Sequence, residues 1–253
     1  GKMNIIGIVG GIGPYAGLDL CNKILEETHV SSDQDHLPVA LVSIPEKIED
    51  RSRFLLGESD VNPAYEVAKV IRKLECTDAS HIAIPCNAMH APEIFDIIKQ
   101  QIQEKGLKVE LLNMVDETIS FIKNHYPGIK KIGVLSTTGT FKKKVYFNAL
   151  RSKGFEPIRP SEEFQKEIHE AVYNRQIGIK AKSSPITNRA KNSLVKGIRY
   201  LKDHGAEGII LGCTEIAYAL PYKKLSDLPL FNSTRILARA LINSTYPEKL
   251  KSI

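Results

Sequence analysis

Short apolar runs alternate with longer amphipathic stretches along the whole chain. Residues 5–9 and 39–44 are runs of the first kind, and amphipathic stretches follow Pro14 and Pro63. This alternation of strand-like and helix-like patterns predicts an α/β fold. Because the strand-like runs are almost uniformly apolar, we expect them to be buried on both faces, as in mainly parallel sheets. Further runs of this kind lie at 82–84, 109–112, 132–135 and 208–211.

The beginning of the pattern recurs in the second half of the chain. A strand-like run, a loop of small residues and a helix-like stretch start at residue 5 and again at residue 131. Each copy is followed by an apolar run that ends in cysteine, with Cys86 79 positions after Gly7 and Cys213 80 positions after Gly133. Such self-similarity predicts two similar halves.

The boundary between the halves is expected between Met114 and Lys130, although no Gly/Ser/Pro-rich linker marks it. We assign residues 1–115 to an N-terminal α/β lobe and 116–219 to a C-terminal α/β lobe. Residues 220–253, with the last strand and helix, are expected to return to the first lobe. Two pseudo-symmetric lobes joined in this way predict an active-site cleft between them.

Composition narrows the class of protein. The chain has 253 residues, of which 42% are apolar and 25% charged, as in ordinary globular proteins rather than disordered or fibrous ones. It contains neither a long apolar segment nor a signal-like start, so we expect a cytoplasmic protein without membrane contact. Gly1 and Lys2 precede Met3 and are interpreted as remnants of an expression tag. The net charge is +6, but the lysines are scattered, which argues against nucleic-acid binding.

Two of the four cysteines are candidates for a catalytic role. No C-x-x-C pair occurs, so neither a zinc site nor a redox pair is indicated, and reduced thiols are expected. Cys21 and Cys76 fall in helical stretches, where thiols behave as small apolar groups. Cys86 and Cys213 instead follow the carboxyl ends of buried strands, where open α/β sheets bind ligands.

Two thiols in matched loops suit the inversion of a carbon centre, in which one removes a proton and the other returns one on the opposite face. One thiol must then be ionised, at a cost of about 2 kcal/mol at neutral pH. Backbone N–H groups and a helix N-terminus beside the cysteine are expected to offset that cost. The carbanion also needs preorganised donors, for which Asn87, Thr137 and Thr214 are candidates by type and position.

At this point the chain resembles the aspartate/glutamate racemase superfamily over nearly its whole length. The resemblance implies two pseudo-symmetric α/β lobes, no pyridoxal phosphate, no metal and commonly a homodimer. It also implies that Cys86 and Cys213 are the acid/base pair. The motifs that carry it, in order, are Gly10–Pro14, Glu49–Ser52, Pro85–His90, Leu135–Thr140, Gly178–Ala181 and Gly212–Glu215.

The resemblance also implies the substrate contacts. Asn87 and Thr214 match positions that contact the substrate carboxylate, and Thr137 matches a position that lines the pocket. Arg51 and Lys180 match the cations that bind the side-chain carboxylate in the aspartate-specific branch, where arginine can bind in a bidentate way. The preferred substrate is therefore aspartate, then glutamate. His90 closes a family motif and is interpreted as a residue that fixes its loop.

Three positions depart from the family pattern. Ala88 replaces the usual threonine after Cys-Asn, Ile12 replaces a frequent methionine, and Asn232 replaces an aspartate at the end of the last strand. These departures bear on the choice of substrate. Both thiols are kept, which favours racemisation over decarboxylation, since the decarboxylases of the superfamily use a single cysteine.

Other interpretations remain open from the sequence. Residues 11–16 fit G-x-G-x-x-A, and Glu46 follows the second strand, as in a dinucleotide-binding oxidoreductase. An inactive amino-acid or dicarboxylate binder with the same fold is a further alternative, as is an isomerase acting on another acid or a hydantoin. Arg51 and Lys180 can also be read as exposed helix charges.

Overall fold

The computed structural model of the chain describes residues 3–253, so the interpretation of Gly1 and Lys2 as tag remnants lies outside the described residues. The predicted α/β fold with mainly parallel sheets is confirmed. The chain divides into two compact units, one comprising residues up to Glu117 together with Thr234–Ile253, the other Thr118–Ser233. No helix in residues 3–253 has both the length and the apolar character required to cross a bilayer.

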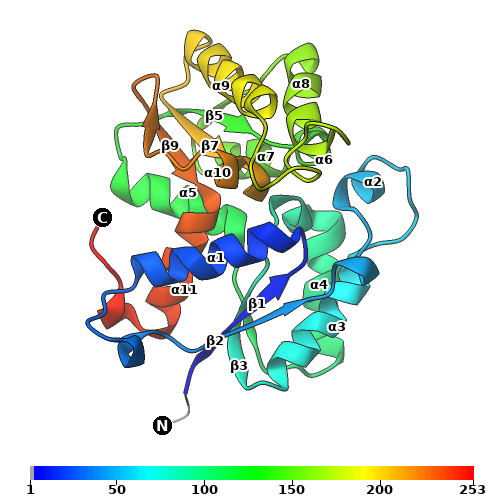
Figure 1. The fold of residues 1–253 in the computed structure, drawn as a ribbon, viewed down its shortest axis with the longest axis vertical. Coiled ribbons are helices and arrows are strands. Elements are labelled where there is room, and N and C mark those ends of the chain that lie inside the picture. Colours follow the sequence, from blue (N-terminus) through cyan, green and yellow to red (C-terminus); the bar gives the residue numbers. More distant parts are fainter. Residues whose placement is uncertain (1–2) are drawn as a thin grey trace. The chain divides into compact units, whose positions relative to one another are not determined.

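The first unit is built on four parallel strands in the order β2-β1-β3-β4, of which Figure 1 labels β1, β2 and β3. Its strands are β1 (Ile5–Gly10), β2 (Val39–Ser43), β3 (Ala79–Ala83) and β4 (Glu110–Leu111). Its helices are α1 (Pro14–Glu27), α2 (Arg51–Leu55), α3 (Ala64–Glu75) and α4 (Pro92–Glu104), with short 3-10 turns η1 (Asp33–Asp35), η2 (Pro45–Lys47), η3 (Asn87–His90) and η4 (Pro247–Lys249). Helices α5 (Met114–His125) and α11 (Ser233–Thr245) carry the chain across the two unit boundaries.

Both faces of the first sheet are covered by helices, as expected for uniformly apolar parallel strands. Ile6 and Ile8 of β1 share one apolar cluster with buried residues of α1 and α11. Gly7 points to the opposite face, where a Cβ on it would lie 3.5 Å from Leu74 Cβ of α3. This alternation follows from the period of two along a strand.

The second unit has a five-stranded sheet in the order β6-β5-β7-β9-β8. Its first four strands run parallel, and β8 adds an antiparallel hairpin to β9. The strands are β5 (Lys131–Leu135), β6 (Glu156–Ile158), β7 (Gly208–Leu211), β8 (Lys224–Leu225) and β9 (Leu228–Asn232). The helices are α6 (Thr138–Lys142), α7 (Val145–Ser152), α8 (Glu162–Tyr173), α9 (Asn188–Asp203) and α10 (Thr214–Ala219).

The two sheets repeat one strand order, which confirms the predicted similarity of the halves. β2, β1, β3 and β4 correspond to β6, β5, β7 and β9. Gly7 and Gly133 occupy equivalent places, because a Cβ on Gly7 would lie 2.6 Å from Ile82 Cδ1 and one on Gly133 2.7 Å from Ile209 Cδ1. In both halves the glycine makes room for the side chain of the neighbouring strand.

The expected return of residues 220–253 to the first half is wrong for 220–233. Strand β9 pairs with β7, with Leu230 opposite Ile209, so the last strand completes the second sheet. The physical reason is the apolar edge of β7, which needs a parallel partner and finds it in the next apolar run of the chain. Only Thr234–Ile253 belongs to the first unit.

Candidate active site

Cys86 and Cys213 occupy equivalent backbone positions in the two units. Cys86 follows β3 and is the N-cap residue of η3, with φ −149° and ψ 112°. Cys213 follows β7 and is the N-cap residue of α10, with φ −144° and ψ 133°. Each residue is 7% exposed. Each thiol thus stands at the carboxyl end of a central parallel strand, where a helical turn begins.

In the first unit, the loop of Cys86 is held by its own backbone and by His90. The Cys86 N–H donates to the Ile84 carbonyl over 2.8 Å, and the Cys86 carbonyl accepts from the Met89 N–H. His90 Nδ1 lies 2.8 Å from the same carbonyl and must donate to it, since a carbonyl only accepts. His90 also stacks on Phe95 of α4. The interpretation of His90 as a loop-fixing residue is therefore confirmed.

His90 predicts a pH dependence of stability. Burial lowers its pKa from 6.5 to about 4, although hydrogen bonds to the Cys86 and Asn87 backbone favour the charged form. As the pH falls from about 6.5 to about 4, the unfolded chain takes up a proton that the folded chain does not. The free energy of unfolding should then fall by on the order of 3 kcal/mol from this group. His90→Asn, which keeps a donor for the Cys86 carbonyl, should remove this dependence in urea unfolding at several pH values.

The control for that measurement is His29→Asn, because His29 is exposed. This variant should keep the wild-type dependence. Equal pH slopes for wild type and His90→Asn would contradict the assignment of a buried neutral imidazole at position 90.

Arg51 belongs to the same unit and is buried rather than an exposed helix charge. It opens α2, whose N-cap Asp50 accepts a hydrogen bond from the Arg53 N–H over 2.9 Å. Arg51 is 7% exposed, and α2 contacts η3, the turn that begins at Asn87. Asn87 itself is 2% exposed. The first unit therefore brings together the helix of Arg51 and the turn that carries Asn87 directly after Cys86.

In the second unit, two loops follow neighbouring parallel strands at one edge of the sheet. The Gly212 N–H donates to the Leu135 carbonyl over 2.7 Å, which ties the loop of Cys213 to the end of β5. Thr137 follows β5, is 5% exposed and is the N-cap residue of α6. Such an edge, where strands β5 and β7 diverge to their helices, is the usual ligand site of an open α/β sheet.

Helix α8 fixes the loop of Thr137 through two side chains that sequence reasoning missed. Gln165 Nε2 donates to the Ser136 carbonyl over 2.8 Å, and the Thr138 N–H donates to His169 Nδ1 over 3.0 Å. Gln165 and His169 are one turn apart on α8, so they reach the loop from the same face of the helix. The spacing of four was visible in the sequence, but nothing in it indicated the loop as their partner.

Glu215 is the other residue that the sequence interpretation left without a role. Its carboxylate accepts three hydrogen bonds, from Lys180 Nζ over 2.7 Å, Thr214 Oγ1 over 3.1 Å and Cys213 Sγ over 3.4 Å. The ion pair with Lys180 is largely shielded from solvent. Lys180 is therefore engaged by the protein itself and is not simply an exposed helix charge. The motif Gly212–Glu215 contained this residue, yet its partner lies 35 positions earlier in the chain.

The expected offset of the cost of thiolate formation is wrong for Cys213. Burial raises the pKa of the Cys213 thiol well above its usual range, and the Glu215 carboxylate raises it further. The Lys180 cation and the backbone N–H groups of Ile216 and Glu215 lower the pKa by less. The surroundings of Cys213 therefore favour its neutral thiol over the thiolate.

A buried tyrosine completes the surroundings of Cys213. Tyr146 is 1% exposed, and a Cβ on Gly212 would lie 3.1 Å from its Cε2 atom. Hydrogen bonds with Thr118 and Ser233 lower the pKa of Tyr146, but burial outweighs them and raises it. Ser233 in turn donates to the Leu211 carbonyl. A side chain at Gly212 would also lie only 3.0 Å from the Leu135 carbonyl oxygen, so this position has little room for any residue larger than glycine.

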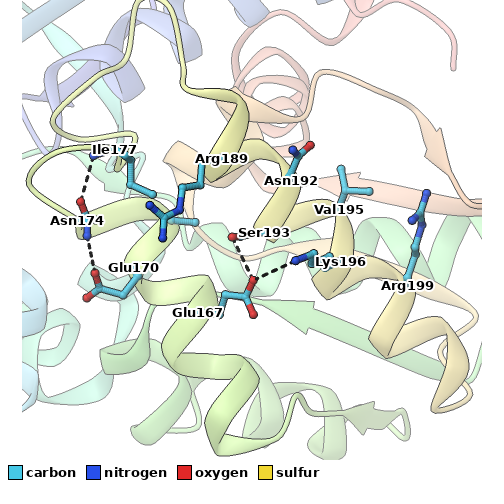
Figure 2. Close-up of a pocket in the computed structure, with 11 residues that line it drawn as sticks. Glu167, Glu170, Asn174, Ile177, Arg189, Asn192, Ser193, Val195, Lys196 and Arg199 are labelled. Atoms are coloured by element: carbon cyan, nitrogen blue, oxygen red, sulfur yellow. Dashed lines mark hydrogen bonds and ion pairs between the residues drawn. The ribbon is translucent and has the colours of Figure 1, made fainter.

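A surface hollow between α8 and α9 contains none of the predicted site residues. Figure 2 shows Glu167 and Glu170 in contact with neighbouring residues of the hollow, whereas no dashed line reaches Arg189 or Arg199. Glu167 accepts from Ser193 over 3.2 Å and lies 4.0 Å from Lys196, while Glu170 accepts from Asn174 over 2.9 Å (Figure 2). Neither Cys86 nor Cys213 lines this hollow.

The predicted site residues fall into two groups, one in each unit. Arg51, Cys86 and Asn87 lie in the first unit, and Ala88 follows them in η3. The second unit contains Thr137, Lys180, Cys213 and Thr214, and Asn232 pairs with Leu211 at the end of β9.

Two α/β units with a cysteine at the same turn of each define the class of protein. The chain matches the Asp/Glu/Hydantoin racemase family over residues 9–241, and it belongs to that family.

Relatives of the chain are named as racemases. The broad specificity amino-acid racemase RacX of Bacillus subtilis (strain 168) is 27% identical over 247 residues, which cover 96% of this chain and 98% of the relative. The structure of Picrophilus torridus aspartate racemase aligns with a TM-score of 0.79 and 28% identity, covering 96% of this chain and 94% of the other. The chain is accordingly an enzyme of the isomerase class.

A more distant structure shares the fold alone. Glutamate racemase from Francisella tularensis subsp. tularensis SCHU S4, in complex with D-glutamate, aligns with a TM-score of 0.59 at 18% identity. The alignment covers 99% of this chain and 84% of that chain. The two-unit α/β architecture is thus common to racemases that have diverged widely in sequence.

Proposed function

We propose that the protein is a cofactor-independent racemase that inverts the α-carbon of an acidic amino acid by two-thiol proton transfer. The observation that carries this proposal is the equivalence of Cys86 and Cys213, each the N-cap residue of the helical turn that follows a corresponding strand of its sheet. In this mechanism each thiol serves one face of the α-carbon of the substrate. Family membership supports this reading over that of a dinucleotide-binding oxidoreductase.

The protonation of Cys213 suggests how the two thiols divide the work. Since burial and the Glu215 charge raise the pKa of Cys213, it rests as the proton donor. In one direction of the reaction, Cys86 removes the α-proton of the substrate and Cys213 delivers its own proton to the opposite face. The two residues have then exchanged protonation states, ready for the reverse reaction. Neither step requires pyridoxal phosphate or a metal.

The substrate preference rests on the cations. A dicarboxylic amino acid offers one carboxylate to Asn87 and Thr214 and a second to Arg51 and Lys180, while Thr137 lines the pocket. Arg51 is buried and Lys180 is half-buried, and cations that are partly shielded from water attract a carboxylate more strongly than exposed ones do. We therefore place aspartate first and glutamate second. The family also includes relatives of broader specificity, so neutral amino acids form the natural comparison.

The test is chiral chromatography of aspartate, glutamate and alanine, each as both enantiomers, without added cofactor. Wild type should racemise aspartate fastest. Arg51→Met should raise KM for aspartate about 10- to 100-fold, the loss expected for a charged hydrogen bond, with a smaller change for alanine. The matched control is Arg53→Met, since Arg53 is exposed on the same helix.

Three other outcomes would each contradict a different part of the proposal. Binding of aspartate without turnover, unaffected by Cys86→Ser or Cys213→Ser, would indicate an inactive amino-acid binder. Turnover of another acid or a hydantoin, with no turnover of aspartate, would be consistent with the two-thiol mechanism but would show that the assigned substrate is wrong. Equal effects of Arg51→Met on aspartate and alanine would remove Arg51 from the carboxylate site.

A cytoplasmic homodimer is the proposed setting, with no nucleic-acid or membrane partner. The family resemblance supports the dimer, and α1 offers a stripe of exposed apolar side chains, Tyr15, Leu18 and Leu25, as a candidate contact. Large exposed apolar groups on one helix face are typical of interaction surfaces.

A further inference from the structure

Glu215 accepts hydrogen bonds from three residues that are proposed to act on the substrate. Lys180 is assigned to the side-chain carboxylate of the substrate, Thr214 to its α-carboxylate and Cys213 to its α-proton. All three donate to the carboxylate of Glu215, which is 8% exposed. A carboxylate of the protein therefore accepts hydrogen bonds from the same groups that are proposed to contact the substrate.

The geometry of the contact favours a competition for Lys180 in particular. Lys180 Nζ and Glu215 Oε1 are 2.7 Å apart, a short charge-assisted hydrogen bond. An ammonium group has three donors, so the limit on joint binding is charge rather than the number of donors. Two carboxylates at one half-buried cation also repel one another, which makes joint binding unfavourable.

We propose that Glu215 is a specificity-determining residue that competes with the second carboxylate of the substrate for Lys180. The inference rests on the proposed function, because it takes the substrate to be a dicarboxylic amino acid. A dicarboxylate must displace Glu215 from Lys180, whereas an amino acid with a neutral side chain leaves the pair intact. Glu215 thereby weakens the binding of acidic substrates and reduces their advantage over neutral ones.

The same pair links substrate binding to Cys213. Lys180 contacts Glu215 Oε1, and the Cys213 thiol contacts Oε2 of the same carboxylate. Once a substrate carboxylate has drawn Lys180 away, Glu215 is less neutralised and holds the Cys213 proton more firmly. The substitution Glu215→Gln would still fill the space and accept a hydrogen bond from Lys180, but without the charge.

The experiment measures binding rather than turnover. Succinate has both carboxylates of aspartate and no amino group, and succinamate differs from it by one amide in place of a carboxylate. Isothermal titration calorimetry gives Kd for both probes with wild type, Glu215→Gln, Lys180→Met and the double variant. Glu215→Gln should tighten succinate by at least about tenfold and leave succinamate within about twofold.

The double variant provides the matched control. In the Lys180→Met background, Glu215→Gln should leave the ratio of the two Kd values unchanged, since the contested cation is absent. If Glu215→Gln fails to fold, Glu215→Asp serves instead, because it draws the carboxylate back by one methylene and should tighten succinate in the same direction. Weaker or unchanged succinate binding in the folded variant would overturn the proposal, as would an equal gain for succinamate.

The outcome is separable from that of the proposed function. Racemisation of aspartate by the same wild-type preparation tests the function by itself. If aspartate is racemised and the Kd ratio does not respond to Glu215→Gln, the competition is wrong and the racemase stands. If neither probe binds any variant, the competition for Lys180 is likewise overturned, whatever the racemisation assay returns.

Discussion

Replacement of either Cys86 or Cys213 by alanine is expected to lower kcat for racemisation by about 10³-fold or more. Proton transfer by a positioned acid or base typically contributes 10²- to 10⁴-fold, and inversion requires both an acid and a base. The loss should fall on kcat rather than KM, because the cations and donors that bind the carboxylates remain. Chiral chromatography of aspartate over time gives both constants.

The other two cysteines provide matched controls for this prediction. Cys21 is half-buried on α1 and Cys76 is exposed after α3, so Cys21→Ala and Cys76→Ala should keep wild-type kcat. In the inactive variants, the remaining thiol should still exchange the α-proton of one enantiomer with solvent, without forming the other enantiomer. Wild-type racemisation by Cys86→Ala or Cys213→Ala would contradict the two-thiol mechanism.

Gly178→Ala should cause the second large effect, a loss of stability of about 3 kcal/mol through overpacking. A Cβ at this position would lie 2.5 Å from the Asn174 carbonyl oxygen, 2.6 Å from the Asn174 nitrogen and 2.7 Å from the Val172 carbonyl oxygen. These are backbone atoms, which cannot turn away as a side chain can. The thermal unfolding midpoint of the second unit should fall on the order of 10 °C in calorimetry.

The same substitution should also disturb the site. The Lys180 N–H donates to the Val172 carbonyl over 3.0 Å, so a shift of that carbonyl moves Lys180 relative to Glu215. Gly128→Ala is the matched control, because a Cβ there would meet no atom within 4 Å. If Gly178→Ala unfolds at the wild-type midpoint, the backbone at the end of α8 can shift to accommodate the added methyl group without loss of stability, and the prediction is contradicted.

The apolar pattern was sufficient to predict the fold. Strands buried on both faces have no polar alternation to obscure them, so β1 and β7 were recognised within a residue of their observed bounds. The repeated strand and loop indicated two similar halves, and the two sheets have one strand order. β3 begins at Ala79, three residues before the predicted run, because Ser80 and His81 interrupt its apolar pattern.

The last strand shows where sequence pattern alone was insufficient. An apolar run near the end of the chain can complete either sheet, and its residues are equally apolar in both cases. The decision depends on which sheet has an open edge, and β7 provides that edge for β9. Pairing between strands is a tertiary property that a run of residues does not encode by itself.

The sequence indicated which residues belong to the candidate site, but not which contacts they make. Cys86, Cys213 and their neighbours were found because they follow buried strands. The ion pair of Lys180 with Glu215 and the support from Gln165 and His169 join residues far apart in the chain. Burial then raised the pKa of Cys213, against the expectation from its adjoining N–H groups, because removal of water outweighs a few donors.

The most direct test of the two-thiol mechanism is the position of solvent deuterium during racemisation in D₂O. With L-aspartate and wild-type protein at early conversion, proton NMR and chiral chromatography report the α-proton of each enantiomer separately. If one thiol removes the proton and another supplies its replacement, the D-aspartate formed should carry deuterium from the first turnovers, while the remaining L-aspartate still carries protium. D-Aspartate that retains the original proton would show that a single group serves both faces, and would contradict the two-thiol mechanism.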